Sequence, residues 1–146
     1  MKTRFKMREV QPQGYQFLMD LDKYLDSTGM SKIERELIKI RASQINGCAY
    51  CMNHHIQDAI RYGENPKRIY VLSAWREAIN WFSEEEQTIL ALTEEVTLIA
   101  NHGVSDEVFD KAVALFGEER TARFIWAIIA INSWNRLGIA LNKHPE

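Results

Sequence analysis

Residues 46–55, NGCAYCMNHH, gather the side chains that could do chemistry. They hold both cysteines of the chain and two of its four histidines. If a helix begins at Cys48, its ~100° turn per residue places Cys51 about 60° and His55 about 20° from Cys48. These three side chains therefore share one face. His54 lies about 60° beyond Cys51 on the same wheel, so we expect it at the surface or at an interface.

The first turn of this expected helix suits thiol chemistry. Cysteines near a helix start meet free N–H groups and the positive end of the helix dipole, which favour the reactive thiolate form. His55, one turn after Cys51, is placed to take up the thiol proton. A cysteine of this kind can attack a peroxide or exchange disulfides.

A zinc site is the main alternative. Two cysteines and His55 would leave a fourth position open, and His102 or His144 could fill it. Structural zinc sites usually bring a second ligand pair at similar spacing, and this chain has none. We therefore expect no metal or other cofactor and favour redox chemistry, with a metal site and an inert cysteine pair as open alternatives.

Glu36 is a second candidate for the site. It lies about 60° from Ile33 and about 40° from Ile40 on a helical wheel, so it borders an apolar face and should be partly buried. A buried carboxylate needs a partner or a task. Either it forms an ion pair with Lys39 or with an arginine of a neighbouring element, or an antiparallel hairpin turning at residues 46–47 brings it to the Cys–His face as a proton acceptor.

Helical periodicity and capping signals extend over nearly the whole chain, and no alternating strand pattern competes with them. The breaks between helices are short and marked by glycine, which favours antiparallel neighbours in one all-α domain covering residues 1–146. We expect helices at residues 15–27, 31–46, 48–62, 66 to 75 or 78, 83–103, 105–117 and 118–141.

Composition limits the possible partners. The chain has 146 residues, of which 46% are hydrophobic and 26% charged, with a net charge of -2. This charge gives no electrostatic reason to expect nucleic acid or an anionic membrane as partner. The N-terminus does not resemble a secretory signal, and the apolar run FIWAIIAI is far shorter than the roughly 20 residues of a membrane helix. We expect a cytoplasmic protein.

The candidate residues together resemble one known family. A Glu, eleven residues, Cys-x-x-Cys, three residues and a His form the core motif of the alkyl hydroperoxidase D (AhpD)-like branch of the carboxymuconolactone decarboxylase family, and Glu36, Cys48, Cys51 and His55 match it. The segments RASQINGCAYC, AWREA, FSEEEQTILALTEE and INSWNRLGIA are also similar to the family. The resemblance covers about residues 30–141.

This resemblance implies an AhpD-like helical bundle with a helix-hairpin core, assembled as a homotrimer or homohexamer. It also implies a thiol-dependent peroxidase without metal or haem, whose partners are a peroxide and a dithiol or protein reductant. Cys51 would be oxidised to a sulfenic acid and Cys48 would resolve it as a disulfide, while His55 and Glu36 relay protons. The apolar surplus of FIWAIIAINSW also suggests a helix covered on more than one side.

Two other functions remain open at this point. One is a thiol–disulfide exchange module that passes electrons to a partner without meeting peroxide. The other is a non-redox lyase like the decarboxylases of the wider family, which do not resemble this chain at the cysteines. One departure from some AhpD-like members is Tyr50, which stands where they carry a histidine directly before the second cysteine.

Overall fold

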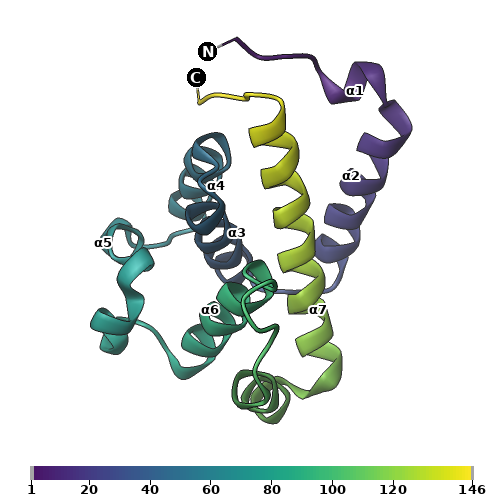
Figure 1. The fold of residues 1–146 in the computed structure, drawn as a ribbon. Helices are drawn as coiled ribbons and strands as arrows, with labels where there is room; N and C mark the ends of the chain where they lie inside the picture. The colour runs from purple at the N-terminus through teal and green to yellow at the C-terminus, as the bar shows by residue number, and fades with distance from the viewer. Residues whose placement is uncertain (1, 146) are drawn as a thin grey trace.

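The computed structural model describes residues 2–145, and these residues contain eight helical segments and no strand. Figure 1 shows how the helices are arranged. The all-α prediction is confirmed. In chain order the segments are α1 (Met7–Val10), α2 (Pro12–Ser27), α3 (Lys32–Asn46), α4 (Ala49–Arg61), α5 (Pro66–Tyr70), the 3-10 helix η1 (Leu72–Trp81), α6 (Glu84–Thr97) and α7 (Asp106–Ala140).

Helices α3 and α4 form the predicted antiparallel hairpin. Ser31 caps the start of α3 by accepting a hydrogen bond from the Glu34 N–H. The helix ends at Gly47, whose φ of 71° lies in the left-handed region that glycine adopts without strain. Cys48 then caps the start of α4. The two-residue turn therefore places the first turn of α4 directly beside the end of α3.

Helix α3 is the central element of the fold because it contributes to two hydrophobic clusters. Ile38 packs into the cluster formed with α2, α6 and α7, which includes Phe124. Leu37 and Ile40 pack into the cluster formed with α4, α5, η1 and α6. Each such side chain stabilises the fold by about 1.5–3 kcal/mol through burial. Side chains on α3 thus project from a firmly held scaffold.

Helix α7 crosses the bundle and lies between the α3–α4 hairpin and α2 (Figure 1). Its helical path is interrupted at Gly117, with φ 74° and ψ 165°, where the sequence predicts one helix to end and another to begin. Helix α6 is shorter than predicted: it ends at Thr97, and residues 98–102 form turns.

The single helix predicted from residue 66 to 75 or 78 is wrong. Helix α5 ends at Tyr70, and η1 contains non-helical residues at Ala74 and Ala78. Leu72 and Trp75 are both buried in the second cluster. The non-helical Ala74 lies between these two residues, so packing against the other helices, and not a regular helical repeat, brings both of them into the core.

Among residues 2–145, no helix combines the length and the apolar character that a membrane crossing requires.

Candidate active site

Cys48 and Cys51 form a disulfide at the start of α4, with their Cα atoms 5.3 Å apart. Cys48 occupies the N-cap position, and its Sγ accepts a hydrogen bond of 3.3 Å from the Cys51 N–H. Free N–H groups at a helix start stabilise negative charge. The same position therefore favours a thiolate when the pair is reduced.

Helix α7 covers both sulfur atoms. Cys48 is 2% exposed and Cys51 is 4% exposed. A Cβ atom added at Gly138 would lie 3.2 Å from the Sγ of Cys48 and 3.6 Å from the Sγ of Cys51. The backbone of α7 thus packs directly on the disulfide. Sequence reasoning did not single out Gly138, although it belongs to INSWNRLGIA, one of the segments similar to the family.

Glu36 and His55 meet across the hairpin. The Nδ1 of His55 lies 2.8 Å from Oε2 of Glu36, and the Nζ of Lys39 lies 3.0 Å from its Oε1. A carboxylate only accepts hydrogen bonds, so Nδ1 carries the hydrogen and Nε2 keeps a free lone pair. The predicted contact of Glu36 with Lys39 is therefore present, and the hairpin also brings the carboxylate to His55, while its action as a proton acceptor stays a prediction.

The pKa values of Glu36 and His55 are both shifted below their ordinary values. Burial raises the pKa of Glu36, but the hydrogen bond from His55 and the charge of Lys39 outweigh burial, and the net pKa lies below its ordinary value. Burial lowers the pKa of His55, and the hydrogen bond to Glu36 offsets this only in part. At neutral pH the site holds a carboxylate and a neutral imidazole, which is the form that can accept a proton.

A buried polar network fixes α7 against the end of α3. The Nδ2 of Asn46 donates to Oδ1 of Asn132 and to Oδ1 of Asn135, both at 2.9 Å. Asn135 in turn donates to Ser43, and Asn132 donates to Thr97. These bonds hold the part of α7 that carries Gly138 over the sulfurs. These hydrogen bonds could not be predicted from the sequence. A helical wheel shows only that a polar residue faces inward, and it does not identify the partner of that residue.

The three remaining histidines, His54, His102 and His144, are exposed. His54 stacks on Tyr50, whose ring also lies 3.8 Å from the Nζ of Lys143. Within residues 2–145, potential metal ligands gather in one group, His54, His55 and Asp58, and neither cysteine belongs to it.

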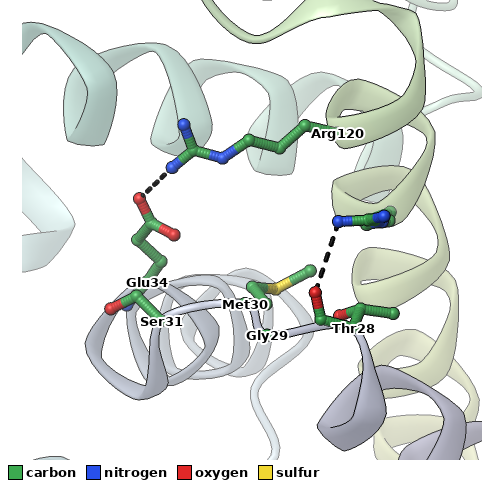
Figure 2. A pocket seen from close by; sticks show the side chains of 7 residues that line it. Thr28, Gly29, Met30, Ser31, Glu34 and Arg120 are labelled. Atoms are coloured by element: carbon green, nitrogen blue, oxygen red, sulfur yellow. Dashed lines mark hydrogen bonds and ion pairs between the residues drawn. The ribbon is translucent and has the colours of Figure 1, made fainter.

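A pocket elsewhere in the fold lacks such chemistry. It lies between the α2–α3 connection and α7, and Figure 2 shows Glu34 paired with Arg120 across it, at 2.7 Å. Burial raises the pKa of Glu34 above its ordinary value despite the charge of Arg120. No cysteine or histidine contributes to this pocket, whose lining residues are Thr28, Gly29, Met30, Ser31, Glu34, Arg120 and Arg123.

Comparisons with known proteins agree with the sequence motif. Residues 12–95 match the model of the carboxymuconolactone decarboxylase family. The chain is 41% identical over 143 residues to the uncharacterized protein YdfG of Bacillus subtilis (strain 168), covering 98% of this chain and 97% of that protein.

Two solved structures share the fold. A protein of unknown function from Agrobacterium tumefaciens, for which a role as the antioxidant defence protein AhpD has been suggested, is 35% identical with a TM-score of 0.94, covering 99% of each chain. The debrominase Bmp8 is 21% identical with a TM-score of 0.83, covering 94% of this chain and 74% of that one. Because one fold can serve different reactions, function must be argued from the site.

Proposed function

We propose that this chain, which belongs to the carboxymuconolactone decarboxylase family, is a thiol-dependent peroxidase that reduces hydrogen peroxide or alkyl hydroperoxides. The observation that carries the proposal is the Cys48–Cys51 disulfide at the start of α4 together with His55, one turn after Cys51 on the same helix, whose Nδ1 lies 2.8 Å from Oε2 of Glu36. A redox-active cysteine pair and an oriented base are the two parts that peroxide reduction by thiols needs. The all-α AhpD-like fold is compatible with this reaction.

In the oxidative steps, the Cys51 thiolate attacks one peroxide oxygen and the O–O bond breaks. The sulfur loses two electrons and becomes a sulfenic acid, while the leaving alkoxide or hydroxide takes up a proton and departs as alcohol or water. The Cys48 thiol then attacks the Cys51 sulfur, expels water and closes the disulfide. His55 accepts the thiol proton through Nε2 and returns it to the leaving oxygen, with Glu36 stabilising the imidazolium.

In the reductive step, an external dithiol attacks the disulfide and becomes oxidised, which returns both cysteines to thiols. Because both sulfurs are buried beneath α7, a small or extended dithiol reaches them with less rearrangement than a broad protein surface would require. This burial favours the peroxidase over a module that exchanges disulfides with a folded partner. A compartment that keeps thiols reduced, such as the cytoplasm, would sustain the cycle.

The test follows the two cysteines separately. Reduced wild-type protein should lose two free thiols after one equivalent of hydrogen peroxide. Cys48→Ser should accumulate a sulfenic acid that dimedone traps, and Cys51→Ser should stay unreacted. Sulfenic acid on Cys48 in Cys51→Ser would exchange the two roles. Reaction at neither cysteine would exclude peroxide as substrate and leave the exchange module or a lyase reaction.

The proposed enzyme is a homotrimer or homohexamer. Trp126 and Ile129, three residues apart on α7, are 49% and 40% exposed, so this helix presents apolar surface to solvent as well as to the core. A second copy of the chain would cover that surface. Light scattering should give three or six times the 17.0 kDa chain mass, and a monomer across a wide concentration range would contradict the assembly.

A further inference from the structure

One face of α4 carries a group of metal-ligating side chains that the proposed peroxidase cycle does not use as a group. A ring nitrogen of His54, a ring nitrogen of His55 and an oxygen of Asp58 lie within 4.8 Å of one another. The residues are adjacent on the helix or one turn apart, so a single rigid element positions all three.

One pair of these atoms already has the spacing of two ligands on a small divalent cation. Two ligand atoms at about 2.0–2.2 Å from a tetrahedral zinc lie roughly 3.3–3.6 Å from each other. The Nε2 of His54 and Oδ2 of Asp58 are 3.5 Å apart. The His54 side chain is 57% exposed and free to adjust, whereas His55 is only 12% exposed and held in place. Three protein ligands would leave a fourth position for water.

The contact with Glu36 orients His55 as a metal ligand. Metal-binding histidines commonly donate their second ring N–H to a carboxylate, which fixes the tautomer and makes the free nitrogen more basic. The 2.8 Å contact between Nδ1 of His55 and Glu36 is such an arrangement. Asp58 has a competitor, since Nη1 of Arg61 lies 3.0 Å from its Oδ1.

We propose that His54, His55 and Asp58 bind a zinc-class divalent cation reversibly, and that this cation inhibits the enzyme by occupying the lone pair of His55. Two imidazoles and a carboxylate are ligands that zinc accepts readily. The binding site stands on its own geometry, whereas the inhibition rests on the proposed peroxidase function, because only there does His55 serve as a base.

Zinc binding is measured first on the oxidised protein, whose disulfide removes both cysteines as ligands. Calorimetry of the full, tag-free chain with zinc chloride should show one equivalent bound. His54→Ala and Asp58→Asn should abolish this binding, and Glu36→Gln should weaken it about 10- to 100-fold. His102→Ala, at an exposed histidine elsewhere, should change nothing. No stoichiometric binding by wild type, or equal loss in His102→Ala, would overturn the site.

The Arg61→Ala variant tests the proposal through the direction of the change in zinc affinity. Removal of this exposed guanidinium frees the second oxygen of Asp58 and takes a positive charge away from the cation, so zinc should bind more tightly. Unchanged or weaker binding would contradict Asp58 as a ligand.

The inhibition is measured separately, as the rate of peroxide reduction with increasing zinc. Wild type should be inhibited at lower zinc concentration than His54→Ala and Asp58→Asn. Equal inhibition of all three would place the inhibitory zinc on the thiolates and overturn the regulatory part. If the protein reduced no peroxide at all, the proposed function would fail, while the calorimetric result would still decide the site.

Discussion

Two carboxylates on opposite sides of α3 differ in their partners and in their state. Glu34 faces α7 and pairs with Arg120, a permanently charged group. Glu36 faces α4 and pairs with His55, which titrates, and with Lys39. Both side chains are largely buried, at 13% and 5% exposed. Burial alone therefore does not distinguish the two carboxylates; the chemistry of their partners does.

The surroundings of the two carboxylates differ as well. The Glu34 region encloses an open pocket (Figure 2). The sulfur atoms near the Glu36 region are closed off by the backbone of α7 at Gly138. The pKa of Glu34 is raised because burial dominates, and that of Glu36 is lowered because its hydrogen bonds and the charge of Lys39 dominate. The open pocket beside Glu34 thus contains no cysteine or histidine, whereas the cysteines are tightly packed against α7.

The largest expected difference between the two carboxylates is in the rate of thiol oxidation. Glu36→Gln keeps the shape of the side chain but removes the charge that orients His55 and stabilises its protonated form. We expect reduced Glu36→Gln to react with peroxide about 100-fold more slowly than wild type. Stopped-flow measurement of tryptophan fluorescence or of free thiols at pH 7 provides the rate.

Glu34→Gln is the matched control, because it makes the same change on the same helix at the other carboxylate. It should react at the wild-type rate. If both variants slowed equally, the effect would belong to α3 as a whole. If Glu36→Gln reacted as fast as wild type, Glu36 would be structural and the distinction between the two sides would fail.

The features of the fold that depend on local signals could be predicted from the sequence. Ser31 and Gly47 mark the start and end of α3 through capping and through a left-handed φ, and both effects act within one helical turn. The hairpin that follows determines that Glu36 and His55 meet. The helical wheel placed Glu36 at the border of the apolar face and predicted partial burial, whereas the structure buries the residue more deeply, at 4% exposed.

Other features depend on distant parts of the chain and left no readable pattern. The break between α5 and η1 follows from the joint burial of Leu72 and Trp75 against other helices, which overrides local helix propensity. Gly138 looks like any small helical residue until α7 is packed on the cysteines. The same holds for Asn135, whose hydrogen bonds reach back 89 and 92 residues in sequence.

A second difference between the regions can be tested with glycine substitutions. Gly138→Ala would place a Cβ atom 3.2 Å from the Sγ of Cys48. We expect this overpacking to lower the free energy of unfolding of the oxidised protein by about 1–3 kcal/mol. Gly14→Ala, in α2, meets nothing within 4 Å and should stabilise by about 0.4–1 kcal/mol. Guanidinium unfolding measures both. Wild-type stability in Gly138→Ala would show that α7 does not press on the sulfurs in solution.

The smallest expected difference is in how the two carboxylates link stability to pH. The pKa of Glu36 is lowered on folding from an ordinary value of 4.5, so its stabilising contribution is present above about pH 4.5 and is lost as pH falls through the lowered pKa. The pKa of Glu34 is raised from the same value, so its contribution is present below about pH 4.5 and is lost as pH rises through the raised pKa.

Urea unfolding of wild type, Glu34→Gln and Glu36→Gln between pH 3 and pH 7 separates these contributions, because glutamine does not titrate. As pH falls, the stability of wild type relative to Glu36→Gln should decrease, mainly below pH 4.5. Relative to Glu34→Gln it should increase, mainly above pH 4.5. The decisive result is that these two stability differences change with pH in opposite directions. A non-specific destabilisation of the fold by acid would change both differences in the same direction. Slopes of equal sign would mean that the two carboxylates do not differ in the balance between burial and partner charge.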